Sequence, residues 1–116
     1  MFGDGSQSRD FTYVDDIARG TIAAIQDVGY EIINLGGGRN PVSLNAIIFK
    51  LEELLCKKAK IDHKPFHVAD LMETWADISK AKNLLGWEPQ VSLDEGLKKS
   101  IQWYINNQNW LKEIIV

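Results

Sequence analysis

The 116-residue chain contains a single cysteine, Cys56, and this scarcity excludes any internal disulfide. A chain without disulfides suits a reducing compartment, so we expect the protein in the cytoplasm. Cys56 lies beside Leu55 in a helical pattern, which favours a small packing residue over a catalytic nucleophile.

Positive charge is also scarce, because 13 lysines and arginines face 16 aspartates and glutamates, for a net charge of −3. No basic block occurs, so the chain lacks the electrostatic footprint of a nucleic-acid or anionic-membrane binder. Apolar runs cover only a few residues, far short of the roughly 20 that cross a bilayer. We therefore expect neither nucleic acid nor a membrane among its partners.

Strand and helix patterns alternate along the chain, which predicts an α/β class, or α+β for the chain taken alone. Two or three short strands are predicted at residues 11–14, 30–38 and 59–65. About four helices are predicted at residues 16–26, 44–58, 78–85 and 93–107. This is a small sheet for so many helices.

Side chains that cap helices support these helix boundaries. Asp16, Ser43 and Asp77 are placed to accept hydrogen bonds at helix N-termini. Ser92 and the glutamate three residues later have the spacing of a capping box. Gly86 has the place of a C-terminal cap in the left-handed conformation.

The predicted strand "YEIINLGG" is apolar on both faces, as in a sheet covered on both sides. The few other predicted strands supply too few neighbours for it. We therefore expect apolar surface to be exposed, and self-association to follow from it.

Two glycine-rich stretches and a histidine pair are weak candidates for ligand sites. "GDGSQS" partly mimics a dinucleotide-binding loop, but no apolar strand precedes it and a strand follows it. The glycines of residues 36–38 do follow a predicted strand, although their spacing differs from that motif. His63 and His67 have the spacing of helical metal ligands, but Pro65 between them forbids the helix.

Arg9 lies in a loop of small polar residues just before a predicted strand. A guanidinium there offers a planar fork of donors that suits phosphate oxygens. Composition by itself favours an ordinary surface salt bridge for this residue, with the ligand role as the alternative.

Four stretches carry a resemblance to a known family: "GDGSQSRDFTYVDDIARG", "INLGGG", "VSLNAIIFKLEELL" and "TWADISKAKNLLGWEPQVSLDEGLKKSIQWY". In this order they resemble the C-terminal part of extended short-chain dehydrogenase/reductase enzymes, the NAD-dependent nucleotide-sugar epimerases and dehydratases. The chain is most similar to the UDP-glucose and UDP-glucuronate 4-epimerase branch. The 4,6-dehydratases are similar, but usually carry Arg-Pro-Gly-His where this chain has "FHVAD".

The resemblance implies that a complete enzyme has an N-terminal Rossmann domain that binds NAD and carries a catalytic Tyr-x-x-x-Lys pair. The sequence contains neither the strand–glycine loop–helix motif nor a tyrosine followed four residues later by lysine. We therefore expect the sequence to start within a larger protein, to lack catalytic and cofactor-binding residues, and to be inactive by itself.

The same resemblance implies roles for three residues in binding a UDP-sugar. Arg9 matches the arginine that contacts the nucleotide diphosphate, which favours the ligand role for it. Asp70 matches the acidic residue associated with the nucleotide ribose. A second arginine usually precedes that aspartate, where this chain has Phe66 and His67, and His67 is a weak substitute as a donor.

The predicted organisation is a single C-terminal substrate-binding region over residues 1–116. Residues 10–38 would pack on the absent Rossmann domain, and residues 39–116 would form a small substrate domain. Two alternatives remain open: a free-standing binding or assembly module, and a fragment of a sugar-nucleotide 4,6-dehydratase. A closed sheet with covered apolar flanks, together with Arg9 locked in an internal ion pair, would contradict the first interpretation.

Overall fold

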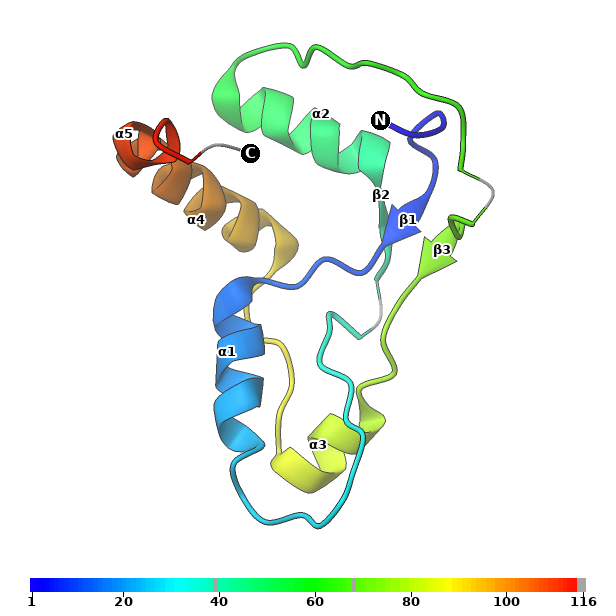
Figure 1. Cartoon of the computed structure of the whole chain (residues 1–116), viewed down its shortest axis with the longest axis vertical. Helices are drawn as coiled ribbons and strands as arrows, with labels where there is room; N and C mark the ends of the chain where they lie inside the picture. Colours follow the sequence, from blue (N-terminus) through cyan, green and yellow to red (C-terminus); the bar gives the residue numbers. More distant parts are fainter. Residues whose placement is uncertain (39, 68, 115–116) are drawn as a thin grey trace.

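The computed structural model describes residues 1–38, 40–67 and 69–114. Its elements are ordered β1, α1, β2, α2, β3, α3, α4 and α5 along the chain (Figure 1). The α/β class is confirmed, with five helices and one three-stranded sheet in the described part. The predicted boundary at residue 39 and the end of the predicted 39–116 unit fall on residues outside this description.

The sheet is small, and its central strand carries Arg9. Strand β1 (Ser8–Arg9) lies between β2 (Val42–Ser43) and β3 (Glu73–Thr74). β1 is antiparallel to β2 and parallel to β3. Each strand has two residues, so the sheet orders the backbone around Arg9 and little else.

The three strands predicted from the sequence are wrong in position. Residues 11–13 have no strand partner and lead directly into a helix, while pairing occurs just before them at β1. The predicted 59–65 strand is reduced to one bridge between Lys64 and Phe2. The segment 30–38 has no strand at all, because none of the described residues supplies a backbone ladder beside it.

Helix α1 (Val14–Ala23) begins two residues before the predicted start, and Tyr13 occupies its N-cap position. The prediction of Asp16 as the cap is therefore wrong, since Asp16 lies within the first turn. Gly20 allows a close approach, because a Cβ there would lie 2.8 Å from both Leu35 and Trp87 side-chain atoms.

Helices α2 (Leu44–Leu55) and α4 (Leu93–Asn106) are capped as predicted. The Ser43 hydroxyl accepts the Ala46 N–H at 3.2 Å, and the Ser92 hydroxyl accepts the Glu95 N–H at 3.3 Å. A short helix α5 (Gln108–Leu111), which the sequence pattern did not predict, follows α4.

Helix α3 (Ser79–Leu85) ends at Gly86, whose φ of 61° confirms the predicted left-handed cap. Ile78 is the N-cap residue, so the prediction of Asp77 at that position is off by one residue. The Asp77 carboxylate still accepts the Ser79 N–H at 2.9 Å, and therefore satisfies a donor at the start of this helix.

A buried carboxylate organises the junction of α1, α3 and α4. The Asp16 carboxylate accepts backbone N–H groups of Gln90 at 3.0 Å and Val91 at 2.9 Å, and pairs with Arg19 at 2.5 Å. The Trp87 indole donates to the Asp16 carbonyl at 2.9 Å. Asp16 and Trp87 are each 1% exposed, so this polar cluster holds the connection between α3 and α4 against α1.

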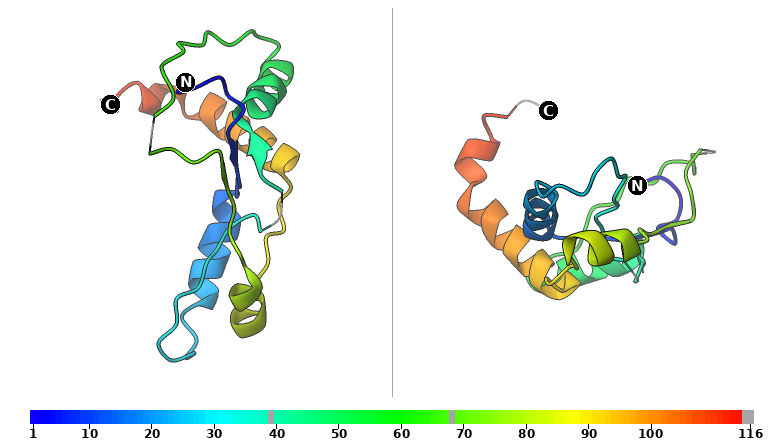
Figure 2. Two further views of the ribbon diagram at one scale, coloured as in Figure 1. Left: turned by 90° about the vertical axis from the view of Figure 1, so that its right-hand side faces the viewer. Right: turned by 90° about the horizontal axis from the view of Figure 1, so that it is seen from below.

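The described structure is open rather than closed around one core. Its surface is 8725 Å², whereas a globular monomer of this mass exposes roughly 6,400 Å². Its radius of gyration is 16.7 Å, against about 13 Å for a compact domain of this length. Figure 2 shows the same openness, with long connecting segments running between separated helices.

The exposed apolar surface includes the outer side of α1 and the segment that follows it. Ile22 and Ile25 are 67% and 83% exposed, and Tyr30 and Ile32 are 95% and 73% exposed. The prediction of uncovered apolar surface is therefore confirmed for this part of the chain. The surface also explains why "YEIINLGG" forms no strand here, because its apolar side chains have nothing to pack against.

The Asp16 cluster makes stability depend on pH. Burial by itself raises the pKa of the Asp16 carboxyl, but hydrogen bonds from Val91, Arg19 and Gln90 outweigh burial and hold that pKa below its ordinary 3.8. A carboxyl whose pKa is lower in the folded state stabilises the fold above its unfolded pKa. That contribution is lost as pH falls through the folded pKa.

Asp16→Asn is expected to lower the free energy of unfolding by about 1–3 kcal/mol near neutral pH, because the new amide N–H₂ group faces a backbone N–H. Urea unfolding followed by tryptophan fluorescence measures this difference. The difference from wild type should shrink as pH falls below 3.8 and through the lower folded-state pKa, because the unfolded chain takes up the Asp16 proton at a higher pH than the folded protein does.

Asp15→Asn is the matched control, because Asp15 is the exposed neighbour on the same helix turn. Its effect should stay within about 0.5 kcal/mol. A loss in Asp16→Asn that remains constant across the acid range would contradict the assignment.

Candidate functional site

The sheet brings two of the predicted site residues together. The Arg9 guanidinium donates through Nη2 to the Asp70 carboxylate and through Nη1 to the Ser8 carbonyl at 2.7 Å. The two side chains are 27% and 33% exposed, so the pair is half-buried. Strand β1 supplies Arg9, and the turn just before β3 supplies Asp70, which also accepts the Leu71 N–H at 3.0 Å.

Two observations together would contradict the interpretation from sequence: an internal ion pair of Arg9, and a closed sheet with covered apolar flanks. The first of them is present. The second is absent from the described residues. Arg9 is paired with Asp70, which is also a predicted ligand residue, rather than with an unrelated acid. The arrangement is therefore a cluster of the predicted site residues, and their ligand roles stay a prediction.

His67 belongs to the same turn as Asp70, although its side chain is exposed. The His67 carbonyl accepts the Asp70 N–H at 2.9 Å, and its ring Nδ1 accepts the Ala69 N–H at 3.2 Å. A neutral imidazole that accepts at Nδ1 carries its proton on Nε2. His67 can therefore offer an Nε2–H donor from this turn.

A cavity of about 550 Å³ lies beside Arg9. It is lined by Arg9, Asp10 and Thr12 from the β1–α1 segment, by residues 33–36, and by residues 74–76. Asp70 and His67 do not line it. Arg9 therefore lines this cavity and is also paired with Asp70, which lies outside the cavity lining.

Asp10 is a residue that the sequence reasoning missed. One of its carboxylate oxygens, Oδ2, accepts the N–H of Gly38 at 2.7 Å and the N–H of Ala76 at 3.1 Å. It therefore joins two segments that line the cavity but lie 38 residues apart in sequence. Its position directly after Arg9 was the one signal that could have indicated it.

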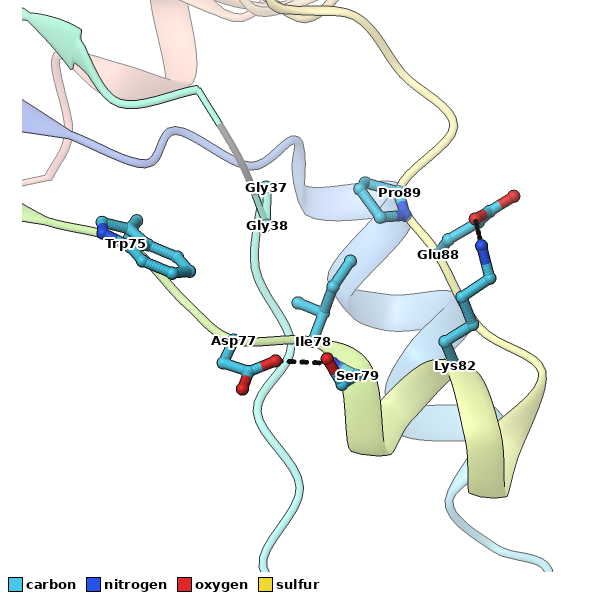
Figure 3. A pocket seen from close by; sticks show the side chains of 9 residues that line it. All are labelled: Gly37, Gly38, Trp75, Asp77, Ile78, Ser79, Lys82, Glu88 and Pro89. Atoms are coloured by element: carbon cyan, nitrogen blue, oxygen red, sulfur yellow. Dashed lines mark hydrogen bonds and ion pairs between the residues drawn. The ribbon is translucent and has the colours of Figure 1, made fainter.

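A second cavity, of about 490 Å³, adjoins the first at Trp75. Figure 3 shows Trp75 at one side of this cavity, Glu88 and Pro89 at the other, and Ile78 between them. Hydrogen bonds from Ser79 hold the pKa of the Asp77 carboxyl below its usual range. The cavity therefore combines apolar walls with one carboxylate and the Lys82–Glu88 ion pair.

The glycine-rich stretches do not fit a dinucleotide. The first leads into strand β1 rather than into a helix. In the second, the Gly38 N–H is already donated to Asp10. Both lack the helix N-terminus that receives a pyrophosphate in such motifs.

The described residues contain no group of three His, Cys, Asp or Glu side chains placed to hold a metal ion. In the same part of the chain, every helix is too short or too polar to cross a bilayer.

Residues 1–100 match the family model described as GDP-mannose 4,6 dehydratase. The chain belongs to this family. The relatives that this chain matches include both kinds named in the resemblance, an epimerase and a dehydratase. The recognition of the chain as the C-terminal part of an extended short-chain dehydrogenase/reductase is thereby confirmed.

Two relatives illustrate the range of proteins to which this chain is similar. UDP-glucuronate 4-epimerase from Thermodesulfobacterium geofontis is 60% identical over all of this chain and 36% of its own length. The dTDP-glucose 4,6-dehydratase of Shigella flexneri is 28% identical, and the match covers 98% of this chain and 34% of that protein.

Solved structures agree with the fold. UDP-glucuronic acid 4-epimerase from Bacillus cereus, in complex with UDP-glucuronic acid and NAD, superposes with a TM-score of 0.81 at 41% identity. UDP-glucose 4-epimerase from Thermotoga maritima, with UDP-glucose, gives 0.84 at 36% identity. These matches cover 91% and 93% of this chain, but 34% and 35% of those proteins. The chain thus spans about a third of the length of these relatives.

Proposed function

We propose that this chain is the nucleotide-sugar-binding region of an NAD-dependent UDP-sugar 4-epimerase. The observation that carries the proposal is the half-buried Arg9, which belongs to β1, lines a cavity and is paired with Asp70. The 60% identity to a UDP-glucuronate 4-epimerase supports the 4-epimerase branch. The family model is described as a dehydratase, which keeps the 4,6-dehydratase as the alternative reaction.

The proposed role of Arg9 is to bind the diphosphate of the nucleotide sugar. A guanidinium offers a rigid fork of five N–H donors, and a diphosphate offers several charged acceptors at matching spacing. The hydrogen bond to the Ser8 carbonyl orients the fork by backbone rather than by a flexible partner. Such fixed orientation reduces the entropy that binding would otherwise cost.

Asp70 would complete this site at the nucleoside end, and His67 would complete it at the phosphates. The Asp70 carboxylate accepts hydrogen bonds, and ribose hydroxyl groups donate them. Without a ligand, Asp70 neutralises and orients Arg9. The Nε2–H of His67 would supply a further donor toward the phosphates, in place of the second arginine that this family usually has.

The contribution of this chain to catalysis would be positional. Holding the diphosphate places the sugar at a defined distance from groups on the rest of the enzyme, and such orientation lowers the barrier substantially. NAD binding belongs, in this proposal, to the two thirds of the relatives that the chain does not span. The chain by itself is therefore expected to be inactive. Its lone Cys56 is exposed, which supports a reducing, cytoplasmic location.

Arg9→Ala is expected to weaken binding of UDP to the chain by at least about tenfold, because it removes charge-assisted hydrogen bonds to the diphosphate. Isothermal titration calorimetry with UDP measures the change. Lys60→Ala is the control, since it removes one positive charge from an exposed position that belongs to none of the strands. Equal UDP affinity in the Arg9 and Lys60 variants would contradict the proposal.

Asp70→Asn separates the two proposed roles of that carboxylate. UDP binding should weaken by about three- to tenfold, since an amide is a weaker acceptor for ribose hydroxyl groups. Binding of inorganic pyrophosphate should stay equal or strengthen, because a negative charge beside Arg9 is removed. If both ligands respond equally, Asp70 acts on Arg9 alone and has no ribose role.

The exposed apolar surface is the proposed contact with the N-terminal domain. Residues 10–38 would pack on that domain, and residues 39–116 would form the small substrate domain. The surface of 8725 Å² exceeds the roughly 6,400 Å² of a closed monomer by more than the area of a standard protein interface. The chain without that domain would cover the surface by homo-oligomerisation, as a free-standing assembly module would.

Analytical ultracentrifugation of the chain is therefore expected to detect self-association at micromolar concentration. Replacing Ile22 and Ile32 together by glutamate should weaken association by about tenfold or more, because two exposed apolar contacts become charged. Phe49→Glu on α2, which is 57% exposed, is the control at a different surface. A monomeric wild-type chain would contradict this part of the proposal.

A further inference from the structure

We propose that Asp10 is a positioning residue for the nucleotide site: its carboxylate sets the distance between the two segments that line the cavity beside Arg9. This inference rests on the proposed function, because it assumes that Arg9 binds the diphosphate. It assigns a role to a residue that makes no ligand contact of its own.

The first observation is the bridge itself. A single oxygen, Asp10 Oδ2, accepts the Gly38 N–H at 2.7 Å and the Ala76 N–H at 3.1 Å. Neither N–H belongs to a helix or strand, so neither segment is held there by a backbone ladder. Hydrogen bonds to a charged acceptor are stronger than neutral ones, and one carboxylate therefore takes the place of regular pairing.

The second observation is the close approach of the glycine loop. A Cβ at Gly37 would lie 2.1 Å from Asp10 Oδ1, and a Cβ at Gly36 would lie 2.6 Å from the Ala76 side chain. No residue with a side chain fits those two places without moving its neighbours. The glycines of "INLGGG" thus serve contact with Asp10 and Ala76 rather than contact with a phosphate.

The third observation is where the bridged segments lead. Residues 33–36 precede Gly38 and residues 74–76 end at Ala76, and both line the cavity that Arg9 lines. Arg9 is also in register with Thr74 across the sheet. Arg9 and the two bridged segments therefore line the same cavity, and Arg9 is paired with one of these segments through the sheet. Loss of the bridge would let the two segments separate and would change the shape of the cavity that Arg9 lines.

The bridge is separate from the cluster that holds the helices. Asp16 joins α1 to the α3–α4 connection, whereas Asp10 joins two connecting segments. Removing the Asp10 bridge should therefore change the geometry of the cavity more than the stability of the fold.

Asp10→Ala is expected to weaken UDP binding by about tenfold in calorimetry, because both N–H groups lose their acceptor. Asp10→Asn should stay within about threefold of wild type, since a single amide oxygen can accept both hydrogen bonds. Asp15→Ala is the control for the loss of one negative charge near the site. Gly37→Ala tests the same contact with the charge retained, and it should weaken UDP binding as Asp10→Ala does.

Each result has a defined meaning. Weakened binding in Asp10→Ala and Gly37→Ala, with Asp10→Asn near wild type, supports the inference. UDP affinity in Asp10→Ala equal to that in Asp15→Ala overturns it. A lowered unfolding midpoint with unchanged affinity of the folded protein also overturns it, because that is the result of a purely structural role.

The proposed function fails in a distinguishable way. If the wild-type chain does not bind UDP, or if Arg9→Ala binds UDP as well as wild type, the site itself is refuted and the role of Asp10 with it. If wild type binds and Arg9→Ala does not, only the Asp10 and Gly37 variants decide the present inference.

Discussion

The described structure depends on carboxylates that accept backbone N–H groups from distant segments. With three two-residue strands, the sheet satisfies few backbone donors, and long connections must find acceptors elsewhere. Asp16 accepts from residues 90 and 91, and Asp10 accepts from residues 38 and 76. These two side chains lie six residues apart. Asp10 connects the N-terminal third of the chain to the middle third at Ala76, and Asp16 connects it to the last third at Gln90 and Val91.

The same constraint explains why Arg9 is well placed while the molecule around it is open. The backbone of Arg9 is fixed by strands on both sides, and its side chain is fixed by Ser8 and Asp70. The helices, in contrast, leave large apolar areas uncovered. Arg9 therefore has a rigid local frame within an open structure, and the chain that forms it spans about a third of the length of its relatives.

Local features of the sequence predicted local structure well. Ser43, Ser92 and Gly86 cap helices as expected, because each cap depends on a hydrogen bond or a backbone angle within a few residues. Two predictions were wrong because distant contacts, or the lack of them, decided the outcome. The "YEIINLGG" strand lacks a neighbour, and the Asp16 carboxylate bonds to residues 74 and 75 positions away instead of capping its own helix.

In the candidate site, too, short-range features could be read from the sequence and long-range contacts could not. The sequence by itself determined the family and the helix caps at Ser43, Ser92 and Gly86, because motifs and caps are short-range patterns. The ligand roles of Arg9, Asp70 and His67 stay predictions. Only the tertiary structure decided that Arg9 and Asp70 meet, 61 residues apart, and that Asp10 bridges two cavity segments. Such contacts depend on how connecting segments cross in space, and side-chain spacing along the chain carries no record of that crossing.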